Sequence, residues 1–333
     1  MAMNPDLIKK AEQLLRSAAH IYIFTHASLD GDALGSIGAL VLALRKNGFD
    51  NALAIIGEYP PKRLSFLMPP EGTFAYANEI NLAGTKDDLA ILVDCANMGR
   101  LSEESRRIAE GCGKKIKIDH HLPCEGSDFA DVDFTNAKWA ATCEGLYKII
   151  KDIDYEIGIR LYTGILTDSG RFTYSCTTGE TLRTVAEIVD VIGTCNTWVS
   201  ETTFDKKPES TFKLHAIAFE KMKSFADGKF MACYLTVDDF KKAGAEINEC
   251  QAIVAELLKV DGAVMSFFLR PNSLTDDCTE FRVSMRSSEP YDVGSICQKF
   301  GGGGHKCASG ATQIGDGDEI FEKIIAEAVK TFQ

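Results

Sequence analysis

The first 200 residues alternate short, continuously apolar runs with longer runs in which apolar residues recur every three or four positions. The short runs are typical of buried strands and the periodic ones of amphipathic helices. This alternation predicts an α/β domain, a parallel sheet with helices on both faces. The apolar run Gly158–Thr167 does not distinguish strand from helix. The expected strands are Ile21–Thr25, Ala52–Ile56, Leu89–Val93 and Lys115–Ile118, and the expected helices are Ala33–Asn47, Thr142–Asp152 and Thr178–Ile192.

The pattern weakens over Cys195–His215, which includes the polar stretch TTFDKKPES and is predicted to be a linker. Strand and helix patterns follow in mixed order, which predicts a smaller α+β domain. We expect domains at 1–194 and 216–333, joined by residues 195–215 and separated by a cleft. The expected elements of the second domain are strand Lys229–Val237, helix Asn248–Lys259, strands Ala263–Arg270 and Glu280–Arg286, helix Val293–Phe300, strand Ala308–Ile314 and a final helix from Asp318.

Composition places the chain among globular proteins, with 45% hydrophobic and 25% charged residues. No apolar run reaches the ~18–20 residues that span a bilayer, so no membrane association is expected. The start of the chain, MAMNPDLIKKAEQLL, predicts an amphipathic helix rather than a signal peptide, so we expect a cytoplasmic protein. The net charge of -12 argues against nonspecific binding to long duplex nucleic acid.

The first candidate for chemistry follows directly after the first predicted strand. His26, Asp30 and Asp32 lie within seven residues, and the carboxyl ends of strands are where sites form in open α/β sheets. The alternative is that Asp32 only caps the following helix; His26 and Asp30 favour metal binding instead. Glycines at 31, 35 and 38 are expected to let this helix pack close to the sheet.

Three further motifs follow apolar runs: Asp94, the triplet Asp119–His121, and Thr167–Gly170. Each alone could be an ordinary turn or an exposed polar group. Together they bring Asp or His to the expected edge of one domain, with three of the six histidines of the chain. Neighbouring histidines point in different directions, so one can bind a metal while the other faces a substrate. Mixed imidazole and carboxylate ligands favour Mn²⁺ over Mg²⁺.

These motifs, in the order HxxxDGD, strand-end Asp, Asp-His-His and TDSG, resemble the DHH phosphoesterase superfamily over residues 20–180. The stretch GGGGHKCASG, from Gly301, resembles the glycine-rich signature of the C-terminal domain in the RecJ and nanoRNase branches. The length and the segment YTGILTDSGRFTYS are most similar to bacterial nanoRNase/pAp phosphatases. That group hydrolyses short oligoribonucleotides and 3′-phosphoadenosine 5′-phosphate (pAp).

The resemblance implies two divalent metal ions, with Asp94 shared between them. Ions ~3.5–4 Å apart lower the pKa of a bridging water, and the expected reaction is attack of that hydroxide on phosphorus. His121 is expected to act on the substrate, and Asp119 to orient a histidine. The implied ligands are His26, Asp30 and Asp94 for one metal, and Asp32, Asp94, His120 and Asp168 for the other.

Two residues depart from the pattern of the family. Leu29 stands where a proline is usual, and Thr173 where a basic residue is common. Neither is an expected metal ligand, so the departures bear on substrate contacts near residues 171–174 rather than on the chemistry.

In the second domain, the alternation over Phe281–Ser287 predicts a strand with a polar, cationic face. Arginine on such a face suits phosphate, and a glycine run can present successive N–H groups to an anion. The alternatives are an ordinary solvated strand face and a flexible loop. With the resemblance, we expect a substrate clamp formed by Arg282, Ser284, Arg286, Gly302, Gly303, Gly304 and His305.

The predicted function is therefore two-metal hydrolysis of short oligoribonucleotides or pAp. The alternatives are a phosphodiesterase for linear dinucleotides from cyclic-dinucleotide turnover, a polyphosphate hydrolase, or a nucleotide-binding sensor without activity. The sequence leaves open the preferred substrate, the direction of attack, the physiological metal and the oligomeric state, a homodimer included.

Overall fold

A computed structural model describes residues 4–193 and 195–332, which divide into two compact units, Met1–Lys206 and Lys207–Gln333. The division lies inside the segment 195–215 that the sequence predicts as a linker. Much of that segment is helical, with α7 at Cys195–Ser200, the π-helical turn η3 at Glu201–Asp205 and the start of α8 (Glu209–Glu220).

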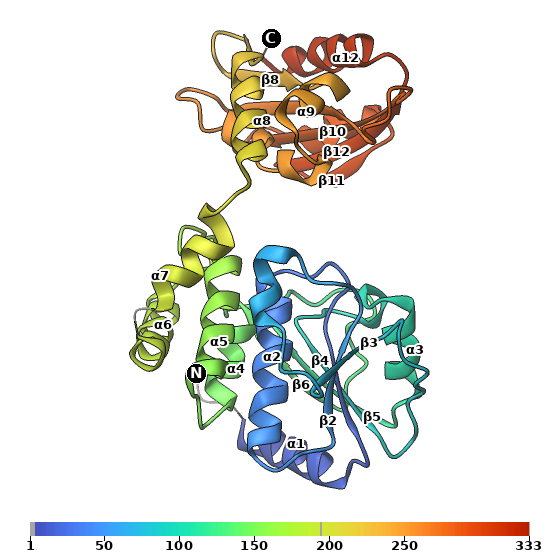
Figure 1. Cartoon of the computed structure of the whole chain (residues 1–333), viewed down its shortest axis with the longest axis vertical. Coiled ribbons are helices and arrows are strands. Elements are labelled where there is room, and N and C mark those ends of the chain that lie inside the picture. Colours follow the sequence, from blue (N-terminus) through green and yellow to red (C-terminus); the bar gives the residue numbers. More distant parts are fainter. Residues whose placement is uncertain (1–3, 194, 333) are drawn as a thin grey trace. The chain divides into compact units, whose positions relative to one another are not determined.

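The first unit, blue to yellow-green in Figure 1, is built on a six-stranded sheet. All its strands are parallel, and their order is β3-β2-β1-β4-β5-β6. This confirms the predicted parallel sheet and its four strands. Two short outer strands, β3 and β6, were not expected because they carry too few buried residues to form an apolar run. The strands are β1 Ile21–Phe24, β2 Ala52–Ile56, β3 Phe74–Tyr76, β4 Leu89–Val93, β5 Lys114–Asp119 and β6 Val132–Thr135.

Helices cover both faces of this sheet, as predicted. Successive strand residues point to opposite faces, so Ile21 and Ile23 of β1 pack in one core and Tyr22 and Phe24 in another. The first core includes α2, α4 and α5, and the second includes α3. The helices of the unit are α1 Pro5–Ser17, α2 Gly31–Lys46, α3 Glu103–Gly111, α4 Thr142–Ile149, α5 Tyr155–Asp168 and α6 Gly179–Ile192, with 3₁₀ turns at Lys62–Leu67 and Met98–Arg100.

The ambiguous apolar run 158–167 is part of helix α5. Every residue from Ile157 to Leu166 is buried. A helix that is buried on all sides shows no polar face, which explains why its periodicity was uninformative.

The glycines of α2 have a different role from the one expected. They permit close contact with helix α5 rather than with the sheet. A Cβ atom on Gly31 would lie 2.3 Å from Oγ1 of Thr167, and one on Gly35 would lie 2.4 Å from the backbone oxygen of Arg160. Contacts this short are possible only for glycine, so the backbone of α2 lies directly against the Thr167 side chain at Gly31 and against the backbone of α5 at Gly35.

The second unit contains a six-stranded mixed sheet in the order β11-β12-β10-β9-β8-β7, in which β8 and β9 are parallel. The predicted α+β class is confirmed, but the expected helix Asn248–Lys259 is broken into η4 Ile247–Cys250 and α10 Ile253–Leu257. The strands are β7 Lys223–Phe225, β8 Phe230–Tyr234, β9 Met265–Pro271, β10 Glu280–Ser287, β11 Gly303–His305 and β12 Ala308–Ile314; the other helices are α9 Val237–Ala243, α11 Val293–Lys299, α12 Gly317–Val329 and the 3₁₀ turn Lys330–Phe332.

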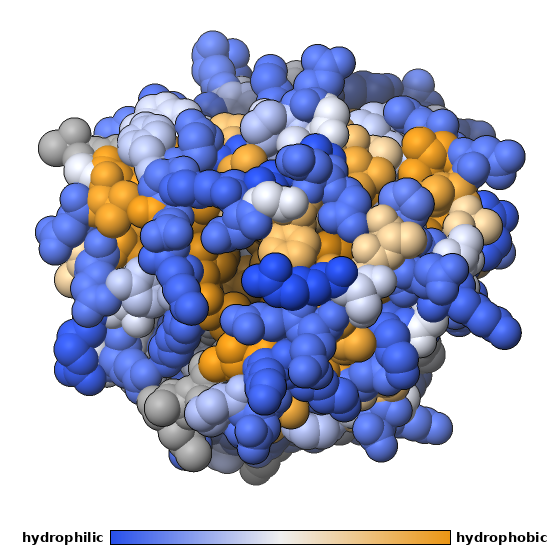
Figure 2. Space-filling view, turned by 90° about the horizontal axis from the view of Figure 1, so that it is seen from below, coloured by the Kyte–Doolittle hydropathy of each residue, from blue (hydrophilic) through white to orange (hydrophobic). Residues whose placement is uncertain are grey.

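The described residues include no helix with the length and hydrophobicity that a membrane crossing needs. On the face shown in Figure 2, hydrophobic residues are scattered among hydrophilic ones. Scattered apolar exposure of this kind is usual on protein surfaces.

Candidate metal centre

Three neighbouring strands of the first unit deliver acidic and imidazole side chains to one edge of the sheet. Phe24 of β1 pairs with Leu92 of β4 in a parallel ladder, so His26 and Asp94, each two residues further on, leave the sheet at the same end. Strand β5 lies next to β4 and ends at Asp119, which precedes the two histidines. The strand order changes direction between β1 and β4, the place where ligands bind in open parallel sheets.

Two helices complete the cluster. Asp30 precedes α2 and caps it, accepting hydrogen bonds from the N–H groups of Asp32 at 3.1 Å and Ala33 at 2.9 Å. The helix cap is therefore Asp30, not Asp32. Asp168 is the last residue of α5, where the helix dipole disfavours a negative charge, so its carboxylate needs a nearby cation.

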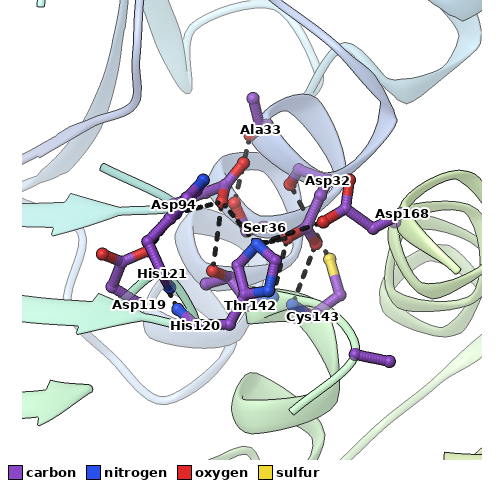
Figure 3. Close-up of polar contacts among 12 residues, drawn as sticks. Asp32, Ala33, Ser36, Asp94, Asp119, His120, His121, Thr142, Cys143 and Asp168 are labelled. Carbon is purple, nitrogen blue, oxygen red and sulfur yellow. Dashed lines mark hydrogen bonds and ion pairs between the residues drawn. The ribbon is translucent and has the colours of Figure 1, made fainter. Parts of the chain in front are cut away.

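Asp32 is fully buried and lies against the start of α4 (Figure 3). Its carboxylate accepts hydrogen bonds from the N–H groups of Thr142 at 2.7 Å and Cys143 at 3.0 Å. These N–H groups have no partner within their own helix, so they favour a bound anion. The sequence did not identify these two residues, although the predicted helix start at Thr142 could have indicated free N–H groups there.

All six predicted metal ligands and His121 lie together. Within each of three groups, potential ligand atoms are within 4.8 Å of one another. Nε2 of His26 is 3.3 Å from Oδ2 of Asp94, and Nε2 of His120 is 3.0 Å from Oδ2 of Asp168. The three groups are His26, Asp30 and Asp94; Asp32, His120 and Asp168; and Asp94, His120 and His121.

Asp119 orients the histidine pair rather than joining these groups. Its Oδ1 atom is 2.8 Å from Nδ1 of His121 and accepts the backbone N–H of His120 at 2.9 Å (Figure 3). On the other side of the cluster, the hydroxyl of Thr142 donates to Oδ1 of Asp94 at 3.3 Å. Both contacts fix side-chain orientation before any ligand arrives.

The electrostatics of the cluster show an excess of negative charge. Burial, together with Asp94 and Asp168, raises the pKa of Asp32 well above its usual value. Burial lowers the pKa of His120, but Asp168 and Asp94 outweigh it and raise that pKa to about 11. Burial raises the pKa of Asp94, and contacts with His120 and His26 reverse this, leaving the pKa below its usual range.

These residues fit divalent cations. The buried Nε2 atom of His120 lies 3.0–3.9 Å from three carboxylates. Within the described residues, however, none of them forms a well-directed hydrogen bond with this atom. The six expected ligands, four carboxylates and the imidazoles of His26 and His120, suit a borderline ion. Bound cations would also relieve the repulsion that raises the pKa of Asp32.

The backbone is strained at the centre. Asp94 has a φ of 52°, in the left-handed region that non-glycine residues seldom adopt. Gly170, Arg171 and Phe172, just after Asp168, also have positive φ values of 55°, 59° and 66°. Arg171 anchors this turn, because its guanidinium contacts Asp205 at 2.7 and 2.9 Å. Strain of this kind persists where surrounding contacts enforce it.

The predicted substrate residues lie in the second unit. Arg282, Ser284 and Arg286 share one face of β10, and the alternate residues of the strand are buried on the other. Gly303, Gly304 and His305 form the edge strand β11 and are exposed. The expectation of successive free N–H groups is wrong for the first two glycines of the run. Gly301 donates to Gln298 at 3.1 Å, and Gly302 donates to Cys297 at 2.9 Å, so both N–H groups close helix α11.

Comparison with known proteins agrees with this architecture. The family model described as DHH family, N-terminal domain, matches residues 20–167, and the DHHA1 domain model matches residues 227–332. The chain is 32% identical to the bifunctional oligoribonuclease and PAP phosphatase NrnA of Thermus thermophilus, over 96% of this chain and 92% of that protein. It is 26% identical to the protein of the same name from Bacillus subtilis, over 92% and 93%.

A solved structure shows the same fold. The exopolyphosphatase-related protein from Bacteroides fragilis superposes with a TM-score of 0.83 at 24% sequence identity, covering 99% of this chain and 97% of that one. Both sequence domains, the full-length relatives and the fold agree with each other. The chain is therefore a member of the DHH family of divalent-metal-dependent phosphoesterases, with a DHHA1 domain in its second unit.

Proposed function

We propose that the protein hydrolyses short oligoribonucleotides and pAp with two divalent metal ions, Mn²⁺ by preference. The observation that carries this proposal is the position of Asp94, which belongs both to the group with His26 and Asp30 and to a group with His120. A carboxylate between two ligand groups is what a pair of ions requires. The names of the relatives from Thermus thermophilus and Bacillus subtilis support the substrates.

Each group of the centre has a distinct task in this proposal. His26, Asp30 and Asp94 would hold one ion, and Asp32, Asp94, His120 and Asp168 the other. Paired ions supply an activated water and stabilise charge on the reacting phosphoryl group.

His121 would donate a hydrogen bond to the phosphoryl oxygen of the substrate. Its side chain is about one-third exposed, so a substrate can reach it, and its contact with Asp119 fixes the ring. An oriented donor is most effective where negative charge develops during the reaction.

The test of function is hydrolysis by the purified protein with Mn²⁺, comparing pAp, diribonucleotides, a long RNA and polyphosphate. Rapid turnover of the first two and little of the last two is expected. A preference for polyphosphate would be consistent with the proposed metal centre but would contradict the proposed nucleotide substrates. An absence of turnover on all four would favour the alternative of a nucleotide-binding sensor.

Arg286→Ala is expected to raise the KM for nucleotide substrates by roughly 10- to 100-fold with little change in kcat. One charge-assisted contact to phosphate has that magnitude, and loss of uniform binding appears in KM. In this structure the guanidinium contacts only the backbone oxygen of Met285, at 2.9 Å, among the contacts described for it, so the change should leave the fold intact. Steady-state kinetics of the variant check this, and an unchanged KM for every nucleotide would remove Arg286 from the substrate site.

A further inference from the structure

All three arginines of the second unit lie on one face of its sheet. Residues 207–333 contain twelve lysines but only three arginines, at positions 270, 282 and 286. Arg282 and Arg286 are four residues apart on β10 and share a face. Arg270 of β9 lies directly opposite Arg282 in the antiparallel ladder, so it points to the same face.

None of these three arginines pairs with a carboxylate within the described residues. Arg270 donates to the backbone oxygen of Pro271 at 2.9 Å, and Arg282 donates to the hydroxyl of Thr312 at 3.3 Å. Many lysines of the same unit do have acidic partners, such as Lys299 with Glu327 at 2.6 Å. In a chain with net charge -12, acidic partners are abundant. The guanidinium groups of these arginines therefore keep N–H donors that can bind an anionic ligand.

The surface around Arg270 and Arg282 is covered on one side and open on the other. On the same face of β9, Ser266 and Phe268 are covered, and the hydroxyl of Ser266 donates to Val254 of α10 at 2.7 Å. Toward β10 and β12 the cover ends, because Arg282 and Thr312 are exposed. A Cβ atom on Gly310 would lie 3.6 Å from Nη2 of Arg282, so the guanidinium lies along the sheet over this glycine.

Two arginines directly opposite each other repel in the absence of an anion, since like charges at such positions are destabilising. The planar guanidinium group matches phosphate oxygens in pairs, which a lysine ammonium does not. We propose that Arg270 and Arg282 bind a second phosphate of the substrate, distinct from the one assigned to Arg286. This proposal rests on the proposed function and extends it to the length of the substrate.

The spacing along β10 indicates which substrates use the second position. Arg282 and Arg286 are four positions apart, which places their Cα atoms about 13 Å apart at ~3.3 Å per residue. This Cα separation exceeds the ~3.4 Å axial rise of one nucleotide in a stacked strand, so we assign the two positions to different phosphates. We therefore expect the Arg270–Arg282 pair to bind oligonucleotides, whose phosphates lie on successive nucleotides, and not pAp, whose phosphates belong to one nucleotide.

The experiment compares kcat/KM for a 5′-phosphorylated oligoribonucleotide of five residues with kcat/KM for pAp, using the full chain and Mn²⁺. In Arg270→Gln the ratio of the two should fall about tenfold, the value of one charged hydrogen bond. Arg270→Lys keeps the charge and loses the paired donors, so it should restore only part of the ratio. Lys259→Gln removes an exposed charge paired with Glu256 in the same unit and should leave the ratio unchanged.

Using the ratio cancels any loss of folded protein in a variant. An unchanged ratio in Arg270→Gln, with the wild type active on both substrates, would overturn the second phosphate position and leave the proposed function standing. An equal loss on both substrates would also overturn it, because the effect would not depend on length. A wild type that hydrolyses neither substrate would overturn the proposed function itself and this inference with it.

Discussion

Replacing Asp94 with asparagine is expected to lower kcat/KM by at least about 10³-fold on every phosphoester that the protein hydrolyses. Asp94 lies 3.3 Å from His26 and 3.5 Å from His120, so among the described residues it is the carboxylate shared by the two proposed metal positions. Loss of this carboxylate would weaken the binding of both metal ions. The charge stabilisation that metal ions supply is worth several kcal/mol, and about 4 kcal/mol corresponds to 10³-fold.

Asparagine is the informative substitution because of the backbone at this position. Asp94 has a φ of 52°, and asparagine is among the few residues that tolerate the left-handed region. Alanine would add backbone strain of about 1–2 kcal/mol, so its effect on activity could not be separated from its effect on folding. Asparagine also keeps an oxygen for the hydroxyl of Thr142.

Metal binding gives a second measurement that does not depend on activity. A ligand that binds only the folded state stabilises it by about 2.7 kcal/mol at a concentration 100 times its Kd. Mn²⁺ should therefore raise the melting temperature of the wild type, and Asp94→Asn should lose most of that increase. Asp190→Asn, an exposed position on α6, is the matched control and should behave as the wild type does. Wild-type turnover by Asp94→Asn would contradict the two-metal proposal.

The parts of the centre that could be predicted from the sequence are those at the ends of parallel strands. Strands β1 and β4 are buried throughout and have continuously apolar sequences, so the polar residues that follow them are conspicuous. Strand β5 is buried only from Ile116 onward, and its short apolar signal ends in the same way, at Asp119. Parallel strands also place their carboxyl ends at one edge. This reasoning is enough to bring His26, Asp94 and the Asp119–His121 triplet together without any knowledge of packing.

The rest of the arrangement depends on tertiary contacts that no local pattern encodes. Asp168 ends a helix, not a strand. The apolar run before it has no periodicity that distinguishes a buried helix from a buried strand. The hydrogen bonds from Thr142 and Cys143 to Asp32 join residues more than 100 positions apart. Likewise, the position of Arg270 opposite Arg282 follows from the register of β9 with β10, which depends on the completed sheet.

Gly35→Ala is expected to damage both the fold and the centre. The new Cβ atom would lie 2.4 Å from the backbone oxygen of Arg160, which cannot rotate away as a side chain can. Overpacking costs about 1–3 kcal/mol, against a gain of up to about 1 kcal/mol from the better helix propensity of alanine. Helix α5 must therefore shift away from α2, and the melting temperature should fall by several degrees.

The same shift should reach the metal ligands, because α2 carries Asp32 near its start and α5 ends at Asp168. Displacement by about 1 Å is enough to cost ~10²-fold in activity. Gly179→Ala, in which the new Cβ would come no closer than 3.5 Å to a neighbouring side chain, is the matched control and should keep wild-type activity and stability. If Gly35→Ala loses stability but keeps both turnover and the melting shift with Mn²⁺, then the spacing of α2 and α5 does not set the positions of Asp32 and Asp168. Loss of all three would mean that the glycine contact between the helices holds the two carboxylates in place.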